Sequence, residues 1–208
     1  MNIENRDRLK FEKQLWSQGY KRIMGLDEVG RGSLAGPVVA AGVIFDSSVN
    51  ISEIKDSKKL SKDTRASLAD EIKSLSLFWT VKEGPISLID RINILWASIE
   101  TMKNCSDTIG ANPDYLLIDG NKFTASLIPF SCIVKGDDRS MTIGAASILA
   151  KVYRDNLMKE LHLKYPEFNW DQNMGYPTKK HKLALKQFGY TKYHRRSFNI
   201  STDKKYKI

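Results

Sequence analysis

The chain contains little cysteine and little histidine, and it lacks a long apolar run. Its two cysteines, Cys105 and Cys132, form neither a disulfide framework nor a zinc pattern, and their scarcity suits a reducing cytoplasm. The three histidines, at positions 162, 181 and 194, show no metal-ligand spacing. The longest nearly apolar run, residues 34–45, has 12 residues, whereas a membrane span needs about 20. Since the polar residues 1–13 show no secretory signal, we expect a soluble, cytoplasmic protein.

Acidic residues are nearly absent from the C-terminal part of the chain. Residues 176–208 hold ten basic residues and one acid, Asp203, so this segment carries the whole net charge of +9. Aromatic residues are interleaved with these charges, among them Tyr176, Phe188 and Tyr193. Such a segment favours attraction to a phosphate backbone together with aromatic contact to sugars or bases. The alternative is a solvated basic segment that only aids solubility.

The length of 208 residues and the share of 41% hydrophobic residues favour one globular domain. Periodicity and turn signals predict strands within residues 23–27, 38–45, 77–82, 115–118 and 128–134. They predict helices over residues 5–19, 61–74, 87–104, 143–163 and 178–188, with a cap at Ser61 and a capping box at residues 87–90. This order predicts an α/β fold with a mixed sheet and helices packed on it. We expect residues 1–165 to form the core and residues 166–208 a basic helical segment of the same domain.

Acidic residues lie at the ends of several predicted strands. Asp27 and Glu28 end the first strand, Asp119 ends the fourth, and Asp137 follows the last with Asp138 beside it. Ligands gather at strand ends near a change of topology, so these carboxylates can converge if the strands of Asp27 and Asp119 are neighbours. Because oxygen-only ligands select Mg²⁺ or Mn²⁺ over zinc, the pattern predicts a site for a hard divalent cation.

Each of these acids also has an ordinary structural interpretation. The Asp119-Gly120 pair is a common turn signal, and either acid after the last strand could cap the long helix that follows. Asp27 and Glu28 add a geometric condition, because successive residues of a strand point to opposite faces. We therefore expect the backbone to end or bulge near Glu28, where Gly30 permits such a break. The grouping of several acids beside a glycine-rich loop favours the metal site.

The glycine-rich loop after the first strand, residues 30–37, has its own alternatives. Backbone N–H groups in such a loop can hold a polyanion beside a metal ion. The spacing Gly30-x-Gly32-x-x-Ala35 also matches the dinucleotide fingerprint, which requires a helix after the loop. Here a proline and a β-branched strand follow the loop, and this context argues against a dinucleotide site.

Seven blocks follow one another in a recognisable order along nearly the whole chain. The most specific is Asp27-Glu28-Val29-Gly30-Arg31-Gly32 with Leu34-Ala35-Gly36-Pro37. The others are Asp56-Ser57-Lys58-Lys59-Leu60-Ser61, Ile118-Asp119-Gly120-Asn121, Lys135-Gly136-Asp137, residues 145–152 with Arg154-Asp155, Gly175-Tyr176-Pro177-Thr178 and His194-Arg195-Arg196-Ser197-Phe198. Together these blocks resemble bacterial ribonuclease HII, a type 2 ribonuclease H.

The resemblance implies a ribonuclease H-like fold, with a five-stranded mixed sheet flanked by helices and a small C-terminal helical part. It implies an endonuclease that hydrolyses RNA in RNA–DNA hybrids and cuts 5′ of single ribonucleotides embedded in duplex DNA, in ribonucleotide removal and repair. The products implied are a 3′-hydroxyl and a 5′-phosphate, and the cofactor is Mn²⁺ or Mg²⁺. We expect the protein to act as a monomer on these duplexes.

The resemblance also assigns the metal site. Asp27, Glu28, Asp119 and Asp137 match the residues that hold the catalytic metal. Two divalent ions about 3.5–4 Å apart can activate water and stabilise the leaving oxygen in an in-line displacement. Asp138 lies one step off the motif, and we treat it as a neighbour of the site.

Three further elements match substrate-binding parts of the family. The loop Gly30-Arg31-Gly32 resembles the element whose backbone reads the 2′-hydroxyl, the group that distinguishes RNA from DNA. Tyr176 matches a tyrosine that packs on the sugar at the RNA–DNA junction. Lys58 matches a lysine near the scissile phosphate, and a solvated loop charge remains a reasonable alternative interpretation. The chain departs from the family pattern at residues 173–174, an Asn-Met pair where His-Lys is common.

Two other functions fit the sequence less well. A basic nucleic-acid-binding module without catalysis would not need the intact set of four acids. A related nuclease on the same fold, such as a resolvase, would not need the Gly-Arg-Gly loop and Tyr176, which favour a reader of ribose.

Overall fold

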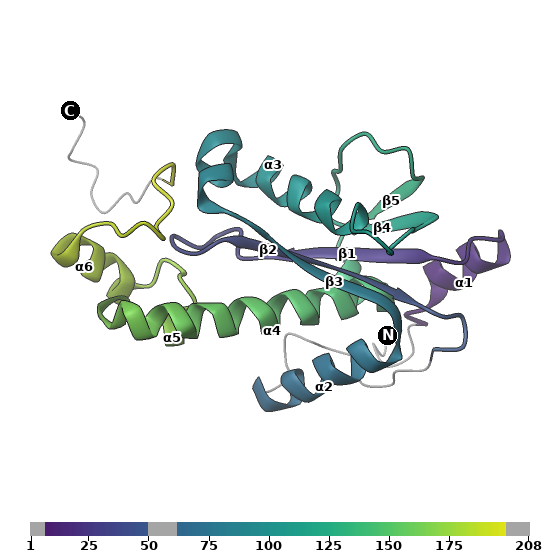
Figure 1. Cartoon of the computed structure of the whole chain (residues 1–208), viewed down its shortest axis with the longest axis horizontal. Helices are drawn as coiled ribbons and strands as arrows, with labels where there is room; N and C mark the ends of the chain where they lie inside the picture. The colour runs from purple at the N-terminus through teal and green to yellow at the C-terminus, as the bar shows by residue number, and fades with distance from the viewer. Residues whose placement is uncertain (1–6, 50–61, 199–208) are drawn as a thin grey trace, which may run out of the picture.

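A mixed sheet with helices on both faces forms the centre of the computed structural model, which describes residues 7–49 and 62–198 (Figure 1). The strands are β1 (Ile23–Val29), β2 (Val38–Phe45), β3 (Ser76–Gly84), β4 (Tyr115–Asp119) and β5 (Phe130–Ile133). They lie in the order β3-β2-β1-β4-β5. The pairs β1–β2 and β2–β3 are antiparallel, whereas β1–β4 and β4–β5 are parallel. The predicted five-stranded mixed sheet is confirmed.

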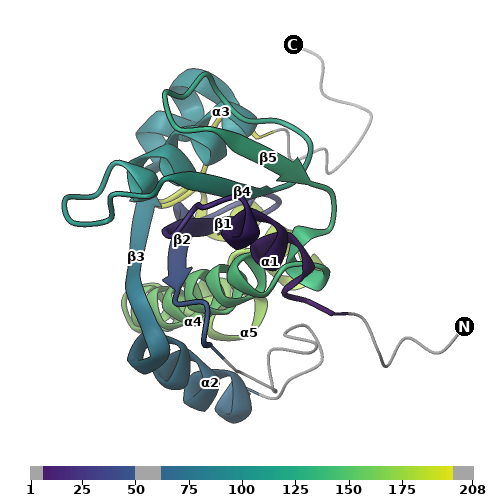
Figure 2. The same cartoon turned by 90° about the vertical axis from the view of Figure 1, so that its right-hand side faces the viewer.

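Two long helices cover opposite faces of the sheet, as Figure 2 shows. These are α3 (Ile86–Ser106) on one face and α4 (Met141–Lys164) on the other, with α2 (Lys62–Leu75) packed against α4. The remaining elements are α1 (Lys10–Ser17), the 3₁₀ turn η2 (Gly136–Asp138), the 3₁₀ turn η3 (Pro166–Phe168), α5 (Trp170–Asn173) and α6 (Lys179–Phe188). Among the described residues, no helix is long and apolar enough to cross a membrane.

Alternation along β1 divides its side chains between the two helices. Met24 and Leu26 join the apolar cluster that includes α3 residues, whereas Ile23 packs with Ile143 of α4. Gly25 lies so close to α4 that a Cβ there would be 2.3 Å from a backbone carbon of this helix. Position 27, two residues further along the strand, therefore faces α4 as well.

β1 continues as a regular strand beyond Asp27. Its pairing with β2 stays in register as far as Val29, opposite Val39. The predicted break near Glu28 is therefore wrong, and the chain turns instead at Gly30, where φ is +93°. Asp27 and Glu28 consequently point to opposite faces of the sheet.

The starts of two helices differ from their predictions. α3 begins at Ile86 with Pro85 at its N-cap and no side-chain cap, so the capping box predicted at residues 87–90 is wrong. α4 begins at Met141, and Ser140 caps it by accepting a 3.2 Å hydrogen bond from the N–H of Ile143. Neither acid of η2 is thus the cap of α4. The cap predicted at residue 61 lies outside the described residues.

The segment after α4 packs against the glycine-rich loop. Leu34 and Ala35 of this loop share an apolar cluster with Trp170, Met174 and Leu185. Apolar burial of this kind couples two parts of a chain into one folding unit. The packing supports assigning the segment to the same domain as the sheet, while the boundary at residue 165 stays a prediction.

Candidate active site

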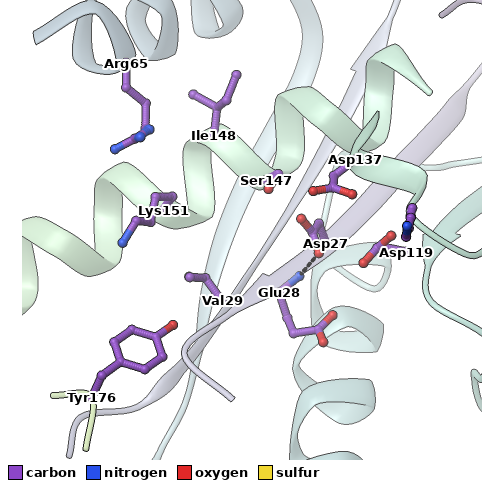
Figure 3. Close-up of a pocket in the computed structure, with 11 residues that line it drawn as sticks. Asp27, Glu28, Val29, Arg65, Asp119, Asp137, Ser147, Ile148, Lys151 and Tyr176 are labelled. Carbon is purple, nitrogen blue, oxygen red and sulfur yellow. Dashed lines mark hydrogen bonds between the residues drawn. The ribbon is translucent and has the colours of Figure 1, made fainter. Parts of the chain in front are cut away.

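A pocket of about 490 Å³ opens where β1 and β4 end (Figure 3). All four carboxylates that the sequence pattern groups together line it: Asp27, Glu28, Asp119 and Asp137. The parallel pairing of β1 with β4 and of β4 with β5 brings their carboxyl ends to the same edge. The sheet therefore gathers acids that are far apart in the sequence.

Asp27 is 5% exposed and faces α4, where Ser147 makes a hydrogen bond to its carboxylate. The backbone N–H of Glu28 donates a 2.7 Å hydrogen bond to Asp27 Oδ1. Burial raises the pKa of Asp27 well above its usual range, and the nearby charges of Glu28 and Asp119 raise this pKa further. Burial and mutual repulsion thus disfavour ionisation of all these carboxylates unless a proton or a cation compensates their charge.

Glu28 reaches the pocket from the opposite face of the sheet, as Figure 3 shows. Its Oε1 accepts a 3.1 Å hydrogen bond from Arg31 in an ion pair. Its Oε2 is buried and has no hydrogen-bond partner among the described residues. Burial raises the pKa of Glu28, although Arg31 opposes this rise. A buried oxygen without a partner costs about 1–3 kcal/mol, and a cation in the pocket would satisfy it.

The turn that carries Asp137 also holds Asp119. The N–H of Gly136 donates a 2.6 Å hydrogen bond to Asp119 Oδ1. Arg8, before α1, donates to the backbone carbonyl of Asp137 and anchors the other side of the turn. Asp137 is buried and lines the pocket, whereas Asp138 is exposed and does not line it. The structure thus separates two neighbouring acids.

The pocket suits a hard divalent cation in its chemistry. The described lining residues include carboxylates and a serine hydroxyl but no histidine or cysteine, and oxygen ligands select Mg²⁺ or Mn²⁺. Within residues 7–49 and 62–198, no three His, Cys, Asp or Glu side chains already stand together as a metal-binding group. Arg31 pairs with only one oxygen of Glu28, so Oε2 stays available to a cation in the pocket.

The predicted substrate-binding residues lie beside this pocket. Tyr176 lines it, and a Cβ on Gly32 would stand 3.8 Å from the Tyr176 ring. Gly30 lies against Arg154, whose Nε would be 2.2 Å from a Cβ at this position, so only glycine fits. The loop residues 30–32 do not line the pocket themselves but contact two residues that do. Lys58 lies outside the described residues.

Two buried arginines fix the glycine-rich loop. Arg154 donates three hydrogen bonds of 2.9–3.1 Å to carbonyls of the loop and of the C-terminal segment. Arg195 donates to the carbonyls of Gly36 and Arg31, at 2.9 and 3.0 Å. In a planar trans peptide the C=O and the following N–H point in opposite directions. Because the Arg31 carbonyl points toward Arg195, the Gly32 N–H points away from it.

The Asn-Met pair that departs from the family pattern has structural partners. Asn173 Nδ2 donates a 2.7 Å hydrogen bond to the Phe168 carbonyl, and its Oδ1 accepts one of 2.8 Å from the Gly175 N–H. Met174 adopts a left-handed conformation with φ of 48°, and its carbonyl accepts from Arg154. These residues therefore shape the turn that leads to Tyr176.

Six other residues line the pocket without a role predicted from the sequence: Val29, Arg65, Lys135, Ser147, Ile148 and Lys151. Ser147 and Lys151 carry a usable signal, because residues four apart lie on one face of a helix. Arg65 offers no such signal, since its place depends on how α2 packs against α4.

Known proteins match this chain in sequence and in structure. The family described as Ribonuclease HII matches residues 24–201. A ribonuclease HII of Halalkalibacterium halodurans is 45% identical over 196 residues, which cover 94% of this chain and 74% of that protein. The crystal structure of ribonuclease H2 from Pyrococcus horikoshii has a TM-score of 0.71 and 25% identity, covering 85% of this chain and 93% of that one. The crystal structure of Bst-RNase HIII in complex with Mn²⁺ has a TM-score of 0.67 and 18% identity. The match covers 95% of this chain and 72% of that one.

The family match extends over nearly the whole described structure. It includes β2 to β5, all of β1 except its first residue, and all four carboxylates of the pocket. The solved structures add that the mixed sheet with flanking helices is the ribonuclease H-like fold. The chain is therefore a hydrolytic enzyme, a nuclease, and it belongs to the ribonuclease HII family.

Proposed function

We propose that this chain hydrolyses RNA in RNA–DNA hybrids and cuts 5′ of single ribonucleotides embedded in duplex DNA. The observation that carries this proposal is the single pocket that Asp27, Glu28, Asp119 and Asp137 line at the end of the sheet. Acids in such number need a cation, and the structurally similar Bst-RNase HIII was solved with Mn²⁺. We assign Mn²⁺ or Mg²⁺ to this site.

The four carboxylates would hold the cations, and their neighbours set the geometry. When bound, two divalent ions supply activation of the attacking water and stabilisation of the leaving 3′-oxygen. Ser147 holds the carboxylate of Asp27, and the Gly136 N–H holds that of Asp119. Hydrogen bonds of this kind restrict side-chain rotation, so they keep both carboxylates directed toward one point. The reaction leaves a 3′-hydroxyl and a 5′-phosphate.

We assign the selection of ribose to the loop Gly30-Arg31-Gly32 together with Tyr176. The loop is rigid, because buried Arg195 and Arg154 bind its carbonyls. The Gly32 N–H points away from Arg195, as a donor for a 2′-hydroxyl, which can both donate and accept. Tyr176 lies against Gly32 and offers its ring to the same sugar. A deoxyribose at this position would leave the donor without a partner.

The exposed basic surface fits a duplex substrate. Lys179 and Lys180 begin α6 and are exposed, in the segment that carries the net positive charge. Attraction to phosphates is additive over such contacts and falls with salt. Because one chain supplies every assigned residue, we propose that the monomer is the active form.

A DNA duplex with one ribonucleotide, incubated with Mn²⁺ or Mg²⁺, tests the proposal. We expect a single nick on the 5′ side of the ribonucleotide, with a 3′-hydroxyl and a 5′-phosphate at the nick. An all-DNA duplex of the same sequence stays intact. If the labelled duplex binds but is not nicked with either metal, the chain is a binding module and the proposal fails.

A further inference from the structure

A carboxylate is buried at the N-terminal end of α4, outside the lining of the pocket. It belongs to Glu12 of α1, which is 0% exposed. Its Oε1 accepts hydrogen bonds from Ser140 Oγ at 2.6 Å, from Thr142 Oγ1 at 2.8 Å and from the Thr142 N–H at 3.0 Å. Its Oε2 is buried and has no hydrogen-bond partner among the described residues. The chemistry proposed above uses no residue of α1, so this buried acid needs an explanation of its own.

Capping of α4 alone does not explain Glu12. The first N–H groups of a helix lack partners within the helix, and the Ser140 side chain already accepts from the N–H of Ile143. Glu12 binds one further N–H, that of Thr142, but its other two bonds go to hydroxyls. A buried carboxylate is costly, and an apolar side chain in its place often stabilises a fold as well or better. The carboxylate adds direction, because it fixes Ser140 and Thr142 relative to α1.

Ser140 ends the turn that carries Asp137. The N–H of Ser140 donates a 2.8 Å hydrogen bond to the carbonyl of Gly136. The N–H of Gly136 in turn donates to Asp119 Oδ1 at 2.6 Å. Asp137 therefore lies between two fixed points: Gly136, which Asp119 holds, and Ser140, which Glu12 holds.

Arg8 holds the same turn from a position just before α1. Its guanidinium donates to the backbone carbonyl of Asp137, and its own carbonyl accepts a 2.9 Å hydrogen bond from the N–H of Met141. Leu15 packs α1 into an apolar cluster that contains Ile143 of α4. The segment from Arg8 to Leu15 is thus attached both to the turn and to the helix that follows it.

We propose that Glu12 and Arg8 are positioning residues, which fix the turn at residues 136–140 so that Asp137 presents its carboxylate to the cation. They act through Asp137 and bind neither the cation nor the substrate. Partners that orient metal ligands change metal affinity or activity by about 10–100-fold. This inference rests on the proposed function, because it takes the four acids as the cation site. It adds that α1 and the residue pair it supports set the affinity of that site.

Binding of Mn²⁺ to the protein without nucleic acid tests this role. The EPR signal of free Mn²⁺ gives the apparent dissociation constant. Glu12→Ala removes the bonds to Ser140 and Thr142, and it should raise this constant about tenfold. Glu12→Gln keeps an oxygen acceptor at the same place, so it should raise the constant less than about threefold. Arg8→Met removes the donor to the Asp137 carbonyl and should also raise the constant about tenfold.

A second variant shows whether Glu12 acts through Asp137. In an Asp137→Asn background, Glu12→Ala should raise the apparent dissociation constant less than about twofold further, because coupled residues are not additive. The matched control is Ile89→Ala, at a fully buried residue of α3 in a different apolar cluster. This control should lower the melting temperature, as core truncations do, and leave the Mn²⁺ affinity unchanged.

Single-turnover cleavage gives an independent readout of the same role. Glu12→Ala should cleave slowly at low Mn²⁺ and return to within about threefold of the wild-type rate at saturating Mn²⁺, since mass action fills a weakened site. Circular dichroism and melting temperature show which variants fold. If Glu12→Ala does not fold, Arg8→Met, at a partly exposed residue, decides alone.

The outcomes separate this inference from the proposed function. If the wild type nicks the duplex but folded Glu12→Ala or Arg8→Met binds Mn²⁺ as the wild type does, the function stands and the inference is wrong. The inference is also wrong if Glu12→Ala has the same effect with and without the Asp137 carboxylate. If the wild type binds Mn²⁺ but nicks nothing, the proposed function fails, and the binding cycle still decides the role of Glu12.

Discussion

The backbone N–H of Gly136 donates a 2.6 Å hydrogen bond to Oδ1 of Asp119. This bond joins the end of β4 to the turn that carries Asp137, and both acids line the same pocket. An asparagine at position 119 could accept the same bond through its own Oδ1. The structure therefore allows the charge of Asp119 to be removed without loss of the turn.

We expect Asp119→Asn to lower the single-turnover cleavage rate by at least about 100-fold. Mutation of residues that only orient metal ligands already lowers metal affinity or activity by about 10–100-fold. Binding of the ribonucleotide-containing duplex should change less than about threefold, since the turn is kept. Cleavage in Mn²⁺ and anisotropy in Ca²⁺ measure the two effects. Cleavage at the wild-type rate would remove Asp119 from the metal site.

Asp137 and Asp138 form a matched pair of neighbours with different surroundings. Asp137 is buried in the pocket lining, whereas Asp138 is exposed outside it. Asp137→Asn should therefore lower cleavage by about 100-fold or more, and Asp138→Asn by less than about threefold. Rates compared at several Mn²⁺ concentrations test this difference. If both variants lose the same cleavage activity, the two acids stabilise the turn and Asp137 is not a metal ligand.

Asp27 illustrates a conflict between stability and function. Burial raises the pKa of Asp27 most, and the charges of Glu28 and Asp119 raise it further. The protonated form of Asp27 therefore stabilises the fold at low pH. This stabilisation is lost as the pH rises through the pKa that Asp27 has in the folded state. At neutral pH in EDTA, Asp27→Asn should raise the free energy of unfolding, on the order of 1 kcal/mol, while abolishing cleavage.

Urea unfolding in EDTA measures this change in the free energy of unfolding. Mn²⁺ should then raise the melting temperature of the wild type, because it binds only the folded state, and should raise that of Asp27→Asn much less. A variant that is less stable than the wild type in EDTA, or that gains equally from Mn²⁺, would contradict the assignment of Asp27.

A chain of buried imidazoles supports the carbonyl of Tyr176. His181 Nδ1 lies 3.0 Å from this carbonyl, so it carries the proton, and its Nε2 accepts from Trp170 Nε1 at 3.1 Å. His194 Nδ1 accepts from the Thr191 N–H at 3.0 Å, and its Nε2 lies 3.1 Å from His181 Nε2. These donors and acceptors match only if both histidines are neutral.

Acid should therefore destabilise the fold through His194. Burial, together with His181, lowers the pKa of His194 from 6.5 to about 4. Neutral His194 contributes its full stabilisation above pH 6.5. As the pH falls from 6.5 to 4, the unfolded chain binds a proton at this residue while the folded chain does not, so the free energy of unfolding declines. We expect a loss on the order of 2 kcal/mol over this range. Urea unfolding at pH steps measures it.

The control for this pH dependence is a second histidine. His194→Gln should flatten the decline, since glutamine can donate from its amide but does not titrate, whereas His162→Gln should leave the decline largely unchanged. His162 is a half-buried residue of α4 beside Asp171, outside the imidazole chain. A wild-type stability that is constant from pH 7 to 4.5 would contradict the neutral pair.

The basic start of α6 should control the salt dependence of binding. Lys179→Gln with Lys180→Gln removes two exposed charges from the segment that holds the net charge. Each phosphate contact contributes about 0.9 to the slope of log K against log salt, so the double variant should lower the slope by up to about 2. Anisotropy titrations at several KCl concentrations measure the slope. An unchanged slope would mean that these lysines are only solvated.

Much of the fold and of the acidic site is predictable from the sequence. Asp27 and Asp119 lie at or near the ends of β1 and β4, Asp137 lies in the turn after β5, and parallel pairing brings these ends to one edge of the sheet. The metal-site prediction needed only this local pattern. The break expected near Glu28 was wrong, because the strand continues to Val29 and Glu28 enters the pocket from the opposite face.

Other features depend on tertiary packing and leave no local signal. Arg65 reaches the pocket only because α2 lies on α4. Asn93 adopts φ of 64° inside α3, and its Oδ1 accepts from the Leu95 N–H at 3.0 Å to restart the helix. Arg154 and Arg195 are fully buried under the glycine-rich loop. Their partners are carbonyls, which sequence patterns do not reveal.

Cleavage of the single-ribonucleotide duplex during a Mn²⁺ titration tests the central claim most directly. The metal is removed with EDTA and then restored in steps, and nicking is followed in single turnovers. We predict no cleavage without metal, recovery with Mn²⁺ to a single cut 5′ of the ribonucleotide, and a rise steeper than that of one binding site. Cleavage at the full rate in EDTA, or no cleavage at any Mn²⁺ or Mg²⁺ concentration, would contradict it.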